Sequence, residues 1–173
     1  MKTIKQADRV VDIITHVFAY IGAAALLFNV VIILLNVLLR AFGSSVIGVE
    51  EYVSLAEVVM IFMAIGYTQW KGGLVHVCFF MKKIPGIGSM IMWTIHMWLA
   101  SAVIFLLIYQ TWVRIPNINQ VTTSLLIPLQ PFYVVLLVGC IVYLIAQMYE
   151  AVKCTVGLFN KELRQEIMNS WPA

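Results

Sequence analysis

The sequence predicts an all-α integral membrane protein, because four long apolar segments make up most of it and almost no charge interrupts them. These segments span residues 17–39, 52–70, 89–113 and 128–149, and Glu57 is the only charged residue inside any of them. A helix needs about 20 apolar residues to cross a bilayer. Charged residues are 11% of the 173 residues, against about a quarter in soluble domains. We therefore expect a single domain of four transmembrane helices.

The first apolar segment, 17–39, follows an amphipathic stretch. Residues 2–15 place apolar and charged side chains on different helical faces, which predicts an interfacial helix leading into the first span. Within the span, Gly22, Asn29 and Asn36 recur every seven residues and so share one face. Small residues let membrane helices approach closely, and amides can bond across the contact. We interpret this face as a packing seam, with a solute-lining role for the two asparagines as the alternative.

The second segment, 52–70, carries an acidic residue inside the membrane. Glu57 lies seven residues after Glu50, at a depth of about 10 Å by helical rise. An intramembrane carboxylate is expensive to bury and is therefore a candidate functional group. Three interpretations stay open. Glu57 either pairs with Arg40 or a partner subunit, gains from the dipole at its own helix N-terminus, or carries a proton or ion.

The third and fourth segments are bounded by aromatic residues typical of membrane interfaces. Trp93 and Trp112 are 19 residues apart, which is roughly 28 Å of helix and close to one hydrocarbon thickness. We assign such residues an anchoring role, together with Trp70, Tyr133 and Tyr149. After the last span, residues 150–173 mix charged and apolar side chains, which predicts a second amphipathic segment on the membrane surface.

The Lys and Arg residues lie mainly on one side of these spans. Three occur in the N-terminal tail, three in the connection after residue 70 and three in the C-terminal tail. The opposite side holds only Arg40 and Arg114. By the positive-inside rule, both termini are expected to be cytoplasmic. The net charge of +3 is then a topology signal, and we expect no nucleic-acid partner.

The titratable residues do not form a recognisable catalytic or cofactor site. His16 and His96 do not match in depth as a haem pair would, and no metal-spaced cluster or phosphate loop occurs. Cys78, Cys140 and Cys154 include no C-x-x-C pair. We therefore expect no enzyme activity, no cofactor and no metal ligand in this chain.

A set of short motifs resembles a known transporter family. They occur in this order: Asn36-Val-Leu-Leu-Arg40, Glu50-Glu51, Gly66, Gly72-Gly73 followed by His76-Val77, and Thr123-Ser124-Leu125-Leu126-Ile127-Pro128. In order, length and topology they resemble the small membrane subunit, DctQ-like or SiaQ-like, of tripartite ATP-independent periplasmic (TRAP) transporters. The resemblance covers about residues 10 to 150. The chain departs from it at Gly48-Val49, where a Trp is common, and at Cys78-Phe79-Phe80, where an acidic residue is common.

The resemblance implies a specific division of labour in the bacterial inner membrane. A large membrane subunit would carry the organic acid, of the sialic acid or C4-dicarboxylate class, together with sodium, which would bind that partner. A periplasmic binding protein would deliver the acid. The small subunit would be a scaffold in contact with both partners and with membrane lipids. Candidate interface or structural polar residues are Asn29, Asn36, Arg40, Glu50, Glu51, Glu57 and His76, and candidate docking residues are Arg114, Glu50 and Glu51.

Two other functional classes stay open from the residues alone. A small proton-coupled exporter would use Glu57 as its carrier group and would work as a homodimer. An accessory subunit of another membrane complex would share every packing feature and differ only in its partner.

Overall fold

A computed structural model describes residues 2–72, 87–160 and 164 of the chain. Within them the regular structure is helical: α1 (Lys2–Ala41), α2 (Val49–Trp70), α4 (Ile87–Arg114), the short 3-10 helix η1 (Ile115–Asn117) and α5 (Gln130–Phe159). Three of these described helices are long and apolar enough to cross a membrane, namely α1, α4 with η1, and α5. The expectation of an all-helical protein with membrane-spanning helices is therefore confirmed, with three candidate spans among the described residues.

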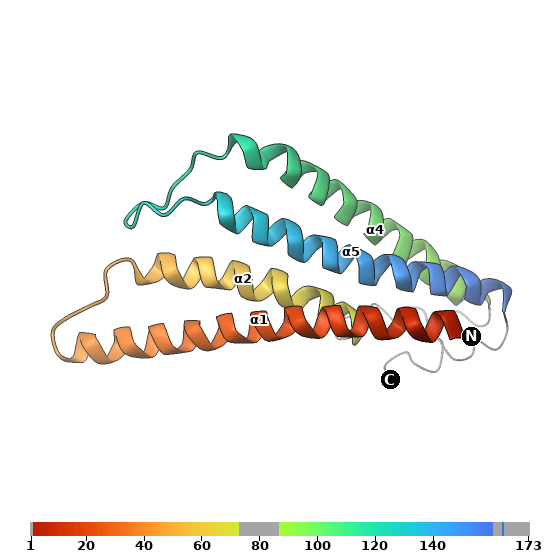
Figure 1. Cartoon of the computed structure of the whole chain (residues 1–173), viewed down its shortest axis with the longest axis horizontal. Helices are drawn as coiled ribbons and strands as arrows, with labels where there is room; N and C mark the ends of the chain where they lie inside the picture. The colour runs from red at the N-terminus through yellow and green to blue at the C-terminus, as the bar shows by residue number, and fades with distance from the viewer. Residues whose placement is uncertain (1, 73–86, 161–163, 165–173) are drawn as a thin grey trace.

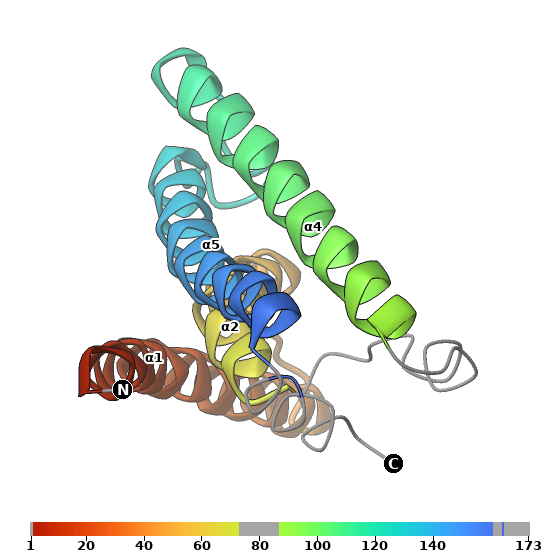
Figure 2. The same cartoon turned by 90° about the vertical axis from the view of Figure 1, so that its right-hand side faces the viewer.

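The helices form an open row in the order α1, α2, α5, α4 (Figure 1). α2 packs between α1 and α5, and α5 packs between α2 and α4. At one end of the molecule, which we call the terminal end, α1 begins and α5 finishes. At the other, the loop end, lie the connections 42–48 and 118–129, and there α4 diverges from its neighbours (Figures 1 and 2).

The contacts between neighbouring helices depend on glycines. A Cβ at Gly22 of α1 would lie 3.0 Å from the Met60 carbonyl oxygen of α2. A Cβ on Gly139 of α5 would fall onto the Phe62 carbonyl group on the other face of α2. Since no side chain separates the backbones at these points, α2 is held closely on both faces. Small residues drive this kind of helix association in membranes.

The best buried part of the molecule lies between the terminal-end halves of α4 and α5. Met90, Trp93 and Met97 pack against Ala151 and Cys154 there. Gln147, which is 2% exposed, donates from Nε2 to the Met97 carbonyl oxygen at 3.3 Å across the same contact. This short core fixes α4 to the row before the two helices separate toward the loop end.

The first helix differs from its expected form. The sequence suggested an interfacial helix over residues 2–15 followed by a separate span, but residues 2–41 form one continuous helix of 40 residues. No proline or glycine occurs before Gly22 to permit a bend. The polar residues of the first turns also contact α2 and α5, which holds this stretch in line with the rest of α1. Of the predicted C-terminal surface segment, residues 161–163 and 165–173 lie outside the described residues.

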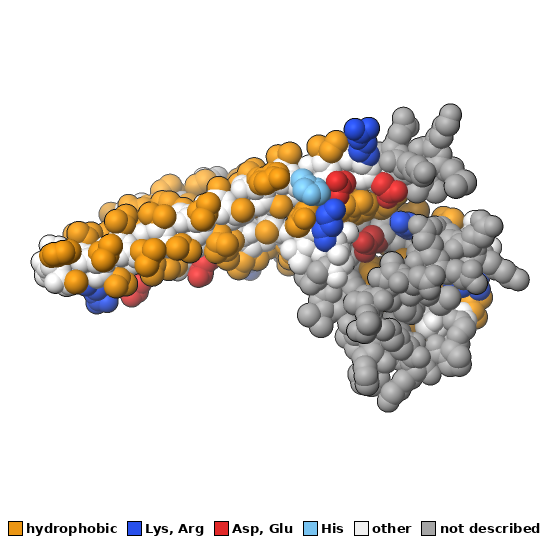
Figure 3. All heavy atoms as spheres, turned by 90° about the horizontal axis from the view of Figure 1, so that it is seen from below, with side chains coloured by type: hydrophobic (Ala, Val, Ile, Leu, Met, Phe, Trp, Pro, Cys, Tyr) orange, Lys and Arg blue, Asp and Glu red, His pale blue; other side chains and the backbone are white. Residues whose placement is uncertain are grey.

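The open row leaves apolar surface on its two outer helices. In an apolar 18-residue stretch of α1, only 11% of the residues are buried inside the protein, against 39% in the corresponding stretch of α5. Figure 3 shows this surface along α1, with most of the charged side chains in view toward the two ends of the molecule. Such a surface requires lipid or a partner protein to cover it.

Candidate functional site

Two loops that are far apart in sequence are joined at the loop end by the carboxylate of Glu51. Its Oε1 accepts a hydrogen bond from the Ser124 backbone N–H at 2.6 Å, and its Oε2 accepts one from Leu125 at 2.9 Å. Charged acceptors of this kind form the stronger class of hydrogen bond. We call this arrangement of Glu51, Ser124 and Leu125 the loop clasp.

Gly48 completes the clasp from the start of α2. Its φ of +73° suits glycine, because a side chain rarely adopts that backbone conformation. The Leu125 side chain lies directly over it, so a Cβ at this position would be only 2.6 Å from Leu125 Cγ. The absence of a side chain at Gly48 therefore leaves room for Leu125 of the second loop.

The second loop is itself a compact hairpin-like turn. Thr122 N donates to the Ile127 carbonyl oxygen at 3.0 Å, and Ile127 N donates to Thr122 Oγ1 at 3.0 Å. Val121 pairs with Pro128 in an isolated bridge. At the tip, Leu126 has a positive φ of 53° and a 68% exposed side chain. The turn therefore presents an apolar side chain at the loop end.

The hydrogen bonds of the clasp stabilise the charged form of Glu51. The Ser124 backbone N–H is the largest cause that lowers the pKa of Glu51 below its ordinary value of 4.5, and Thr122 and Leu125 contribute in the same direction. Partial burial opposes this by raising the pKa. Glu51 is thus an ionised acceptor that holds two backbone N–H groups.

The other polar residues expected at the loop end are arranged differently. Asn36 Oδ1 accepts a hydrogen bond from Val46 N at 3.2 Å and so fixes the turn after α1. Arg40, Glu50 and Arg114 have exposed side chains at the loop-end boundaries of α1, α2 and α4. Within the described residues, the ion pairs involve only Asp12, with His16 and Lys71.

Of the interpretations offered for Glu57, the structure does not form the ion pair with Arg40. Glu57 is exposed on α2, and the two side chains form no ion pair in the part of the chain that the structure describes. The physical reason is rotational: Glu57 lies on the face of α2 that its packing neighbours leave uncovered. Among the three glutamates of α2, Glu51 is the one whose carboxylate bonds to a distant part of the described chain.

The seam on α1 faces α2 at two of its three positions. Gly22 lies against Met60 and Ala64, and Asn29 is 5% exposed. The Oδ1 atom of Asn29 is buried without a hydrogen-bond partner among the described residues. Asn36, one further repeat along, contacts the loop instead. His76, the last candidate interface residue, lies outside the described residues.

A polar cluster at the terminal end was not expected from the sequence. Asp12 Oδ1 accepts hydrogen bonds from Trp70 Nε1 at 2.8 Å and from Lys71 Nζ at 2.9 Å, while Asp12 Oδ2 lies 3.4 Å from His16 Nδ1. One turn earlier, Asp8 Oδ1 accepts from the Tyr149 hydroxyl at 2.7 Å. These bonds connect α1 to α2 and to α5.

The signal for this cluster was present in the i, i+4 spacing of Asp8 and Asp12. Two acids on one face of a helix that leads into a membrane imply cross-helix partners, because uncompensated carboxylates are costly there. The sequence predicts only an anchoring role for the aromatic residues. Trp70 and Tyr149 instead donate hydrogen bonds to these acids, and their rings lie 5.7 Å apart.

Comparison with known protein families places these contacts in context. Residues 29–156 match the family described as tripartite ATP-independent periplasmic transporters, DctQ component. The chain belongs to this family. A DctQ component is the small subunit of a TRAP transporter, as the order of the motifs suggested. No curated protein and no solved structure matched the chain.

Membership of the DctQ family also bears on partners and location. It implies that this small subunit works with a large TRAP membrane subunit and a periplasmic binding protein, and that it is a multi-pass membrane protein. All residues of the loop clasp fall inside the matched range, whereas Asp8 and Asp12 precede it. The clasp also joins two of the motifs on which the resemblance rests, Glu50-Glu51 and the segment from Thr123 to Pro128.

Proposed function

We propose that this DctQ component is the stationary scaffold subunit of a sodium-coupled TRAP transporter in the bacterial inner membrane. In this proposal α2 spans the membrane with the other three long helices, both termini are cytoplasmic, and the loop end faces the periplasm. The large subunit carries sodium and an organic acid of the sialic acid or C4-dicarboxylate class. The family resemblance supports the proposed coupling to sodium and the proposed class of substrate.

The observation that best supports a scaffold role is the open row of helices. α1 has little intramolecular cover, and its exposed apolar side chains include Leu27, Val31, Leu34 and Leu38. These positions share one face, because they are spaced by three or four residues. We propose that the large subunit covers this face, since a continuous apolar stripe suits helix packing over a long contact.

The loop end supports a second contact. The clasp fixes the turn before α5 to the start of α2, and Leu126, Glu50 and Arg40 are all exposed at this loop end. We propose that the periplasmic binding protein docks on this surface, with Arg114 at its edge. We further propose that Arg40, Glu50 and Glu51 stabilise the corner between α1 and α2 against the large subunit, with Glu51 acting through the clasp.

Co-purification tests the whole proposal. The tagged chain, expressed with its neighbouring genes and extracted in mild detergent, should retain a stoichiometric partner of about a dozen spans, identified by mass spectrometry. Alanine at Arg40, Glu50 and Glu51 together should lower the yield of that complex and the uptake of substrate. A homodimer without a large partner would contradict the proposal and would make Glu57→Gln the next variant, as the exporter alternative requires.

A further inference from the structure

A groove of about 480 Å³ runs along the contact between α1 and α2. Every side chain that lines it comes from these two helices. Its floor is hollow because the residues there are small, namely Ala19, Gly22, Ala23 and Ala64. The groove therefore results from the same close approach at Gly22 that packs the two helices together.

The groove has one polar end and one apolar end. His16 and Tyr67 lie at the polar end with their rings 4.8 Å apart, and Leu26 lies at the other. The ten residues from His16 to Leu26 correspond to about 15 Å of helix. That length is half of the roughly 30 Å hydrocarbon core, or one leaflet. The groove thus matches the depth of a single acyl chain that starts at the membrane interface.

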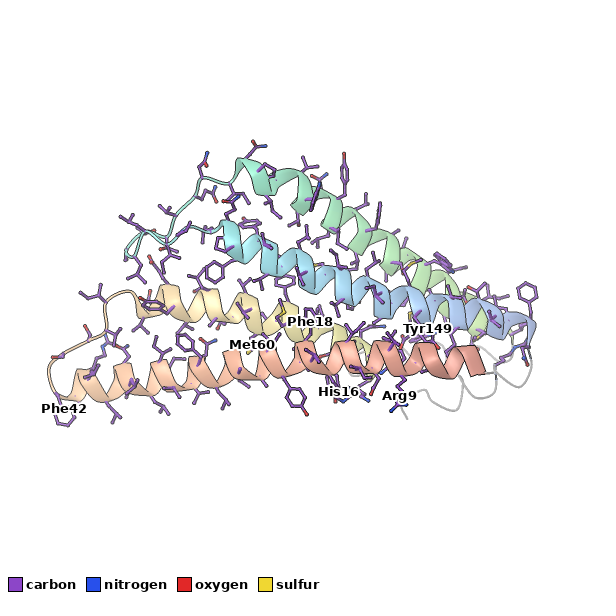
Figure 4. All side chains as sticks on the ribbon, in the orientation of Figure 1. Arg9, His16, Phe18, Phe42, Met60 and Tyr149 are labelled. Atoms are coloured by element: carbon purple, nitrogen blue, oxygen red, sulfur yellow. The ribbon has the colours of Figure 1, made fainter. Side chains whose placement is uncertain are left out.

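Basic side chains lie beyond the polar end. The Lys71 ammonium lies 5.7 Å from the centre of the Tyr67 ring and is 45% exposed. Arg9 is exposed two helical turns before His16, on the same face of α1, and Figure 4 labels both residues at the terminal end of the helix. Asp12 neutralises Lys71, which leaves the Arg9 guanidinium to attract an anion.

The size of the groove argues against a protein helix as its occupant. A helix of 10–12 Å diameter occupies more than about 1,100 Å³ over a length of 15 Å. That is more than the space the groove encloses, so a helix could cover the groove but could not fill it. An acyl chain is narrow enough to enter, and its chemistry matches a floor of alanine and glycine.

We propose that this groove binds one acyl chain of a glycerophospholipid whose phosphate lies beside Arg9, near the Lys71 ammonium. The lipid belongs to the leaflet at the terminal end of the molecule. It fills the space that the small residues leave, so α1 and α2 are bridged by lipid where their side chains do not meet. This inference does not depend on the substrate or ion of the transporter.

Photo-crosslinking with a defined lipid tests the site. The probe is phosphatidylglycerol with a diazirine in the middle of one acyl chain, added to the full-length chain purified with its large-subunit partner. We expect cross-links in peptides covering residues 16–26 and 60–67. Ala23→Phe should lower their yield at least tenfold by filling the groove, whereas Ala24→Phe, an exposed neighbour that does not line the groove, should change it less than twofold.

Two further variants test the head-group contact and guard against misfolding. Arg9→Gln should lower the cross-link yield about threefold, and Arg9→Lys should restore it. If Ala23→Phe does not fold, the smaller Ala23→Leu replaces it. Equal labelling of the apolar face of α4, at residues 99–106, would show annular lipid only and overturn the proposal. Cross-links unaffected by Ala23→Phe, or a partner peptide found in the groove, would overturn it too.

Discussion

At the scale of single residues, two adjacent glutamates in this chain have different structural roles. Glu51 accepts two backbone hydrogen bonds from the loop before α5, whereas the Glu50 side chain is exposed. Sequence could group them as one acidic motif, but the 100° rotation between consecutive helical residues separates their environments. The pair therefore offers a matched experiment, in which the same chemical change is made at neighbouring positions.

We predict that Glu51→Gln destabilises the protein and Glu50→Gln does not. The amide nitrogen of Gln cannot accept the second backbone N–H, so one donor of the loop loses its partner. The unfolding midpoint in detergent should fall by about 2–4 °C for Glu51→Gln and stay within about 1 °C for Glu50→Gln. Equal midpoints for the two variants would contradict the role of the clasp.

The clasp should also depend on pH in a defined direction. Because the pKa of Glu51 is lowered, its contribution to stability is fully present above the ordinary value of 4.5 and is lost as pH falls through the depressed value. The difference in midpoint between the wild type and Glu51→Gln should therefore stay constant from pH 7 to 5 and shrink below about pH 4. A difference that already disappears at pH 6 would exclude this explanation.

At the scale of helices, the glycines set how closely α2 is held. Gly139 meets backbone atoms of Phe62, which cannot rotate away, while Gly66 meets the Val142 Cγ1 atom at 2.9 Å, which can. The identity of these contacts could not be read from sequence, because a glycine in a span is equally compatible with a lipid-facing position. Only the pairing of the helices distinguishes the two cases.

A graded result is expected from alanine at these two glycines. Gly139→Ala should force α2 and α5 apart and cost more than about 3 kcal/mol, seen as loss of folded protein in size-exclusion chromatography. Gly66→Ala should cost about 1 kcal/mol and leave the elution profile unchanged. The reverse order would mean that α5 packs on α2 in a different register.

The first turns of α1 depend on Asp12 for their position. Asp12→Asn should weaken the bond to Lys71 by removing the charge, and this loosens residues 2–14 from α2. Amide hydrogen exchange in that stretch should become at least fivefold faster, while residues 22–40 keep the wild-type rate. Uniform acceleration along α1 would instead indicate global destabilisation.

At the scale of the whole molecule, the open row predicts which faces contact a partner. Val31 of α1 and Val103 of α4 are exposed to similar degrees, 53% and 56%. If the large subunit covers α1, Val31→Trp should reduce the yield of complex several-fold, whereas Val103→Trp should leave it unchanged on a lipid-facing surface. The opposite pattern would assign the interface to α4.

Orientation can be measured with single cysteines and an impermeant maleimide. Ser44→Cys and Asn119→Cys, in the two loops of the loop end, should react in intact cells. Gly72→Cys, at the end of α2, should react only after lysis if α2 spans the membrane as proposed. Labelling of Gly72→Cys in intact cells would exclude the four-span arrangement.

Composition and spacing were enough to predict the class of fold, since apolar length alone defines helices that belong in a membrane. They could not predict that α1 continues unbroken from residue 2, because Asp8 and Asp12 read as surface residues until their partners on α2 and α5 are known. The clasp could not be predicted either. Glu51 could be named as a candidate residue, but the backbone N–H groups that its carboxylate binds have no sequence signature.

The loop clasp also sets an order of events during synthesis. Glu51 and the Ser124 N–H that it accepts are separated by 73 residues. At 5–20 residues per second, the ribosome makes the second partner about 4–15 s after the first. Throughout that interval α2 exists without the turn that the Glu51 carboxylate will hold. The two loops can therefore close only once α4 has been made, and the terminal end matures later still, because Asp8 waits for Tyr149, which follows it by 141 residues.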